Sequence, residues 1–105
     1  MLQAKKGEYD RALPLYEEAL AMRRAVLPAG HPDIATSLSN LAGLYKSKGE
    51  YDRSLPLYEE ALALHRAALP AGHPHIATSL SNLAALYESQ GEYDRALPLY
   101  EEALA

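Results

Sequence analysis

The stretch Gly49–Gln90 reads GEYDRSLPLYEEALALHRAALPAGHPHIATSLSNLAALYESQ, and the 42 residues before it, Gly7–Lys48, nearly duplicate it. A third copy begins at Gly91 and runs to Ala105. A fixed period of this length is typical of a solenoid, in which each unit buries its apolar face against its neighbours. The first two copies differ at eight positions: Ala12/Ser54, Met22/Leu64, Arg23/His65, Val26/Ala68, Asp33/His75, Gly43/Ala85, Lys46/Glu88 and Lys48/Gln90.

The period divides the chain into one array of two and a half units. The segment 1–6 aligns with the end of a unit and is expected to be the tail of a helix whose body is missing. Complete units follow at 7–48 and 49–90, and the unit at 91–105 is cut short. The chain therefore has the pattern of a piece of a longer array, and its high internal identity fits either recent duplication or consensus design.

Composition narrows the classes of function. Hydrophobic residues make up 49% of the chain and charged residues 23%, which is ordinary for a folded globular domain. The net charge of −4 argues against nucleic acid as a partner. There is no cysteine, so disulfides and thiolate chemistry are excluded, and the cytoplasm is the favoured compartment. No apolar run approaches the ~20 residues of a membrane span, so we expect no membrane partner.

Each unit contains a long helix followed by a short one. The long helix is predicted at about 9–27 and 51–69, with apolar residues at Tyr51, Leu55, Tyr58 and Leu62, and it begins again at Tyr93. A proline recurs within it (Pro56 in the second copy), and we place this proline within the first turn, where its missing N–H matters least.

The short helix is predicted at about 33–46 and 75–88, after a Leu-Pro-Ala-Gly turn. Pro32 and Pro74 stand at its first position, and His31 and His73 are candidate N-caps. Glycine follows each short helix at Gly49 and Gly91, and it is expected to end a helix at Gly7 too. No segment shows two-residue alternation, so the fold class is all-α, with antiparallel helix pairs.

The spacing Leu38-x2-Leu41-Ala42-x2-Tyr45, followed by Gly49-x-Tyr51 and Tyr58-x2-Ala61, resembles the tetratricopeptide (TPR) repeat. The period of 42, eight more than the usual 34, is similar to that of the repeats of kinesin light chain and of related bacterial arrays. This resemblance implies a TPR-like α-solenoid with a right-handed superhelix. It also implies a non-enzymatic scaffold that binds a protein or an extended peptide.

No set of residues suggests catalysis, a cofactor or a metal site. The histidines at 65, 73 and 75 lack a full set of metal ligands, since the first copy has Arg23 and Asp33 in place of two of them. We expect the histidines that are not N-caps to be solvated. The paired glutamates, such as Glu59-Glu60, point ~100° apart on a helix and form a solvated face. No nucleophile with a base and no phosphate-binding loop is present.

The resemblance places a ligand groove on the short helices, because these helices line the concave face in TPR proteins. An asparagine recurs there once per unit and offers donors and an acceptor to a peptide backbone. The alternative is that these residues are only small, polar and solvent-facing. The candidate peptide-binding residues are Thr36, Ser39, Asn40, Lys46, Thr78, Ser81, Asn82 and Glu88.

The two ends form a second candidate surface. Residues 1–48 carry seven basic and five acidic side chains, a net +2, whereas residues 49–105 carry three basic and nine acidic ones, a net −6. Each end is expected to expose an apolar stripe that a neighbouring unit would cover. We therefore predict head-to-tail association of copies, and a structural spacer or self-assembling repeat without its own ligand is the alternative function.

Overall fold

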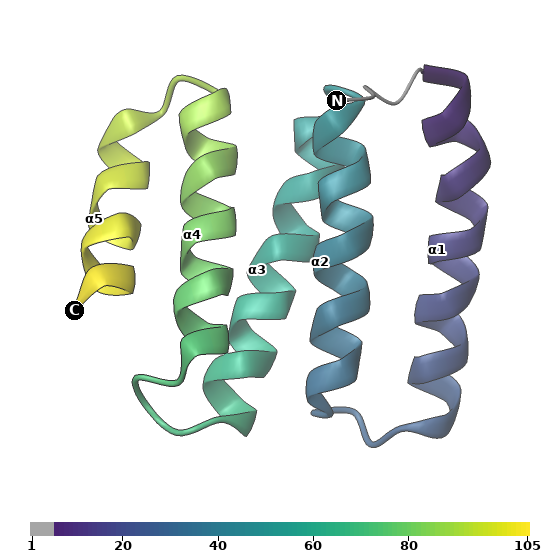
Figure 1. Cartoon of the computed structure of the whole chain (residues 1–105), viewed down its shortest axis with the longest axis horizontal. Helices are drawn as coiled ribbons and strands as arrows, with labels where there is room; N and C mark the ends of the chain where they lie inside the picture. The colour runs from purple at the N-terminus through teal and green to yellow at the C-terminus, as the bar shows by residue number, and fades with distance from the viewer. Residues whose placement is uncertain (1–5) are drawn as a thin grey trace.

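The computed structural model describes residues 6–105, and within that range it contains helices and no strand. Helices of consecutive units lie side by side, and successive helices run antiparallel (Figure 1). The predicted all-α solenoid of helix pairs is therefore confirmed. The helices are α1 (Lys6–Val26), α2 (Pro32–Ser47), α3 (Tyr51–Ala68), α4 (Pro74–Ser89) and α5 (Tyr93–Leu104).

The histidine before each short helix caps it. His31 Nδ1 accepts a hydrogen bond from the backbone N–H of Asp33 at 3.0 Å, and His73 Nδ1 accepts one from His75 at 3.1 Å. Proline follows each cap at the first helical position, where no N–H is needed. The predicted N-caps and helix starts are confirmed.

A glycine closes each short helix and leads directly into the next long one. Gly49 has a φ of +80° and Gly91 a φ of +77°, a conformation that only glycine adopts without strain. The Glu50 N–H bonds to the Tyr45 carbonyl at 2.9 Å, and the Gly49 N–H bonds to Lys46 at 2.9 Å. These two bonds form a Schellman motif, which satisfies the last carbonyls of α2. The next helix begins one residue later, so neighbouring helices must pack closely.

The start of the chain differs from the expectation. Gly7 was predicted to follow a helix end, but it lies inside α1, which begins at Lys6. Gly7 also lacks the positive φ of Gly49 and Gly91. The predicted helix tail at 1–6 falls almost entirely outside the described residues.

The proline of each long helix lies deeper than predicted. α3 begins at Tyr51 and Pro56 is its sixth residue, so the placement within the first turn was wrong. Pro98 holds the same place in α5, and Pro14 is the ninth residue of α1. The helix start is set by the Schellman motif, not by the proline. Pro56 and Asp52 are both exposed, so the carbonyl that loses its partner can bind water.

Small residues bring the helices together. Ala42, Ala61 and Ala84 have no exposed surface, and Ala96 is 3% exposed. One cluster joins Ile34, Ala35 and Leu38 of α2 to Ala61 of α3. The second cluster links α2, α3, α4 and α5, and it comprises Ala42, Tyr58, Leu83, Ala84, Leu86, Tyr87 and Ala96. The core is thus continuous from unit to unit, as a solenoid requires.

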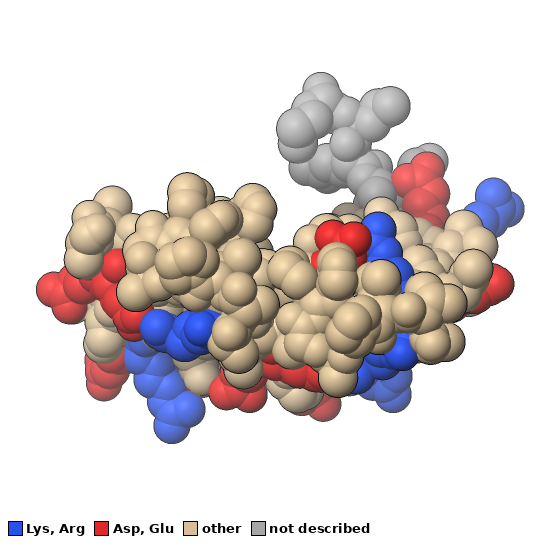
Figure 2. All heavy atoms as spheres, turned by 90° about the horizontal axis from the view of Figure 1, so that it is seen from below, with Lys and Arg blue, Asp and Glu red and all other residues tan. Residues whose placement is uncertain are grey.

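Charged side chains are concentrated on the long helices. Arg24 of α1 pairs with Glu60 of α3 at 2.9 Å, and one unit later Arg66 pairs with Glu102 of α5 at 2.7 Å. Among the Lys, Arg, Asp and Glu residues, α2 carries only Asp33 and Lys46, and α4 only Glu88. In Figure 2, charged atoms gather along the lower edge of the molecule, whereas the left part of the upper edge is largely uncharged. The short helices therefore present a weakly charged polar surface.

Candidate functional site

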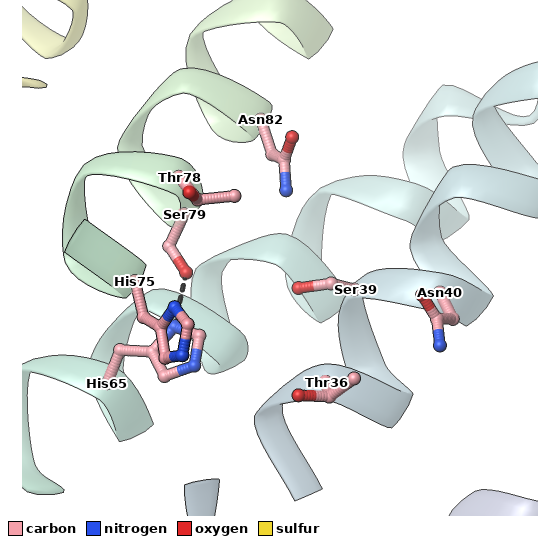
Figure 3. A pocket seen from close by; sticks show the side chains of 8 residues that line it. All are labelled: Thr36, Ser39, Asn40, His65, His75, Thr78, Ser79 and Asn82. Atoms are coloured by element: carbon pink, nitrogen blue, oxygen red, sulfur yellow. Dashed lines mark hydrogen bonds between the residues drawn. The ribbon is translucent and has the colours of Figure 1, made fainter. Parts of the chain in front are cut away.

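A hollow lies between consecutive short helices. It has a volume of about 230 Å³ and is bounded by α2, α4 and the end of α3. Figure 3 shows Thr36 and Ser39 of α2 pointing toward α4, and Thr78 and Asn82 of α4 pointing toward α2. The lining residues are Thr36, Ser39, Asn40, His65, His75, Thr78, Ser79 and Asn82.

The hollow brings together five of the eight residues proposed from the sequence. Thr36, Ser39 and Asn40 come from α2, and Thr78 and Asn82 from α4. The remaining three do not line it. They are Ser81, Lys46 and Glu88, and the Glu88 carboxylate instead accepts a hydrogen bond from the Tyr100 hydroxyl at 3.0 Å.

The side-chain amides in the hollow are available to a ligand. Neither Asn40 nor Asn82 hydrogen-bonds through its side chain to another described residue, and Asn40 is exposed. The threonine hydroxyls are engaged within their own helices, Thr36 with the Pro32 carbonyl at 3.5 Å and Thr78 with Pro74 at 3.2 Å. The asparagines are therefore the strongest unused donors and acceptors in the hollow.

One end of the hollow is formed by histidines. His65 is only 7% exposed, and its Nδ1 lies 2.5 Å from the Ser79 hydroxyl oxygen. The His75 ring lies 5.8 Å from the His65 ring, centre to centre, and His73 lies 4.8 Å from His75. The expectation of solvated histidines is wrong for His65, because α4 covers it. This burial, together with the neighbouring His75 and His73, lowers the pKa of His65, so the neutral form is favoured.

The hollow holds no carboxylate, and its only titratable groups are the two histidines. Within residues 6–105, no three His, Cys, Asp or Glu side chains are grouped so that they could hold a metal ion. What the hollow offers is hydrogen bonding from amides, hydroxyls and imidazoles, which suits recognition of a polar ligand.

A smaller hollow of about 120 Å³ occupies the corresponding place one unit earlier, between α1 and α2. Arg23 takes the position of His65, and its Nη1 donates a hydrogen bond to the Asp33 carbonyl at 2.8 Å. Asn40 lines both hollows, so the two are neighbours along α2. The lining residues are Tyr16, Ala19, Arg23, Ser37 and Asn40.

The sequence interpretation missed the histidine end and Ser79. Two of the eight differences between the copies, Arg23/His65 and Asp33/His75, fall at this place. These two differences between the copies were therefore the sequence feature that could have pointed to the histidines. They were not interpreted in this way, because the position of His65 near the end of a long helix does not indicate that the next short helix buries its side chain.

Comparison with known proteins places this architecture in a family. The family model described as Tetratricopeptide repeat matches residues 1–67 and, in an overlapping match, residues 33–105. The chain belongs to the tetratricopeptide repeat family. The predicted TPR resemblance is thereby confirmed, and a comparison with curated proteins gave no match.

Solved TPR structures of the kinesin light chain type are similar to this one. One is a protein of Podosopora anserina described as a kinesin light chain with nearly identical TPR-like repeats, at a TM-score of 0.84 and 28% identity. Another is BtubC (BKLC) from P. vanneervenii, at a TM-score of 0.79 and 33% identity. The comparison covers 92% and 94% of this chain, respectively, but only 46% and 39% of those chains. This TPR array thus spans less than half the length of either.

Among the helices in the described part of the chain, none combines the length and the apolar character needed to cross a bilayer.

Proposed function

We propose that this TPR array is a non-enzymatic scaffold that binds an extended segment of a protein partner along its short helices. The observation that carries the proposal is the hollow between α2 and α4, in which equivalent residues of two units face the same space. A ligand running across the short helices would meet Asn40 and then Asn82, one unit apart. Each amide can pair with a peptide group, which has one donor and one acceptor.

The chemistry of the hollow supports binding without catalysis. It contains no carboxylate, no thiol and no metal-ligand cluster, and its serine–histidine pair has no third residue that would orient the histidine as a base. The weakly charged surface of the short helices also argues for a protein ligand rather than a nucleic acid, which requires neutralisation of phosphates.

Replacing both asparagines tests this proposal. Peptides selected from a random displayed library would be titrated against the wild-type chain and against Asn40→Ala/Asn82→Ala. A hydrogen bond contributes about 1 kcal/mol, so the double change is expected to weaken binding about tenfold to thirtyfold. Glu101→Ala, on an exposed face of α5, is the matched control and should leave the affinity unchanged. If the double variant bound the peptides as tightly as the wild-type chain, the proposed pairing of the ligand with Asn40 and Asn82 would be contradicted.

A second candidate function, self-assembly, is supported by exposed apolar side chains at both ends of the array. On α1, Leu15 is 65% and Met22 63% exposed, and on α5, Tyr93 is 63% and Leu97 60% exposed. The corresponding residues of α3 are partly buried and pack against the clusters to which α2, α4 and α5 contribute; they are Tyr51, Leu55, Leu57 and Leu64. The N-terminal half is also net basic and the C-terminal half net acidic. We infer that copies associate head to tail, with α5 of one copy against α1 of the next.

Light scattering over a dilution series measures this association. The average mass is expected to rise with protein concentration, since a head-to-tail contact does not close on itself. Leu15→Glu/Met22→Glu should keep the chain monomeric, whereas Glu59→Gln, on an exposed part of α3, should not. A wild-type chain that stays monomeric at the highest concentration would refute self-assembly and leave the peptide-binding proposal intact.

A further inference from the structure

We propose that His65, His75 and Ser79, which we call the histidine pocket, form a proton-gated subsite that takes a carboxylate side chain of the bound segment. This inference rests on the proposed function, because the histidine pocket is one end of the same hollow that contains Asn40 and Asn82. It adds a chemical class of ligand residue and a dependence on pH. Figure 3 shows both imidazoles at the α3–α4 side of the hollow.

The first step is access to the buried imidazole. His65 engages the Ser79 hydroxyl through Nδ1, and no other hydrogen bond is formed by its side chain within the described residues. In that part of the chain, no fully buried side-chain nitrogen or oxygen lacks a partner. The second ring nitrogen, Nε2, therefore keeps some exposed surface, and the His65 side chain lines the hollow. His75 is exposed beside it, so a ligand group could contact both rings.

The second step concerns the charged groups around His65. The residues that face His65 from α2 are the uncharged Thr36 and Ser39, and those from α4 are His73, His75 and Ser79. On α3, the adjacent Arg66 is already paired with Glu102 of α5. Among residues 6–105, no carboxylate lines the hollow where it could neutralise a protonated His65.

Protonation would place imidazolium rings about 5–6 Å apart. Two like charges at this separation disfavour each other, and this repulsion adds to the cost of burial. An anionic oxygen between the rings offsets both the repulsion and the cost of burying a charge, and it accepts hydrogen bonds from the two rings. Because the two equilibria are linked, carboxylate binding raises the pKa of His65 and lower pH tightens carboxylate binding. A neutral hydrogen-bonding ligand gains no such advantage.

The residues at the equivalent place in the first unit differ in charge from those of the histidine pocket. Arg23, at the position of His65, is a permanent cation that donates a hydrogen bond to the Asp33 carbonyl, and Asp33 takes the position of His75. The first unit thus carries a permanent cation beside an acidic residue, whereas the second carries two titratable imidazoles in a hollow without a carboxylate. A volume of about 230 Å³ fits one side chain and lies below the ~300–1,000 Å³ of sites for drug-sized ligands.

The probe is the blocked amino acid N-acetyl-glutamate α-amide, which carries one side-chain carboxylate, and its uncharged counterpart N-acetyl-glutamine α-amide is the control. Each would be titrated into the chain at about pH 5.5 and pH 8, on either side of the ordinary histidine pKa, while NMR follows the imidazole resonances. The glutamate probe is expected to shift the signals of His65 and His75 and to bind at least about tenfold more tightly at the lower pH, equivalent to about 1.4 kcal/mol. Equal affinity at both pH values, or equal binding of the glutamine probe, would overturn the proposal.

Two variants make the result specific. His65→Arg introduces the residue that the first unit carries, so the fold should tolerate it, and the pH dependence of glutamate binding should fall to the part that His75 contributes. His75→Gln changes an exposed residue and should reduce the pH effect. If library-selected peptides bind through Asn40 and Asn82 but the glutamate probe does not bind, this inference fails and the proposed function stands. If the probe binds at His65 but no peptide does, the proposed function fails instead.

Discussion

Leu38→Ala is expected to lower the free energy of unfolding by about 2–5 kcal/mol. Leu38 has no exposed surface and packs in the cluster formed by α2 and α3. Removing its methyl groups would leave a cavity lined by Ile34 and Ala61, and the helices on either side are held by their own loops and cannot fully close it. A domain of this size is stable by only about 5–15 kcal/mol, so the loss is a large part of the total.

Urea denaturation would measure the change from the transition midpoint, provided that the slope of the transition stays constant. Leu15→Ala is the matched control. Leu15 is 65% exposed on α1, so its truncation should change stability by less than about 0.5 kcal/mol. Leu80, the counterpart of Leu38 in α4, is 2% exposed and should behave like Leu38. A loss below 1 kcal/mol for Leu38→Ala would mean that α2 does not hold the two long helices together as described.

The caps and the period show why most of the fold was predictable. A histidine followed by proline is typical of an N-cap and the first helical position, and a glycine after the last apolar residue is typical of a helix end. These signals are local, and each occurs twice. The depth of Pro56 was not predictable in the same way. It depends on the Schellman motif at Gly49 and Glu50, which starts α3 at Tyr51, five residues before the proline.

The site was only partly predictable because a hollow needs two helices. The sequence treats Ser39 and Ser81 as equivalent, yet only Ser39 faces the space between α2 and α4. Ser81 lies on the other face of α4, where no further short helix follows in this chain. His65 was missed for the same reason, since its burial comes from α4 and not from its own helix. Equivalent sequence positions thus have different surroundings wherever the array lacks a neighbour.

Pro56→Ala is expected to stabilise the chain by about 2 kcal/mol. Proline inside a helix costs ~3 kcal/mol relative to alanine. Part of that gain is offset because proline also restricts the unfolded chain, a contribution of about 0.4–1 kcal/mol. The new N–H could bond to the Asp52 carbonyl, which now faces water. For a domain of about 100 residues, this gain corresponds to a rise in melting temperature on the order of 8–16 °C.

Thermal unfolding followed by circular dichroism would test the prediction, and Pro98→Ala gives the internal comparison. Pro98 holds the same place in α5, which packs mainly on α4, so its replacement should stabilise the chain less than that of Pro56, whose helix packs on both α2 and α4. A fall in melting temperature for Pro56→Ala would mean that the proline contributes to packing, because the bend that it introduces would be needed to fit α3 between two short helices. The recurring proline would then be a structural requirement of the 42-residue unit and not a tolerated cost.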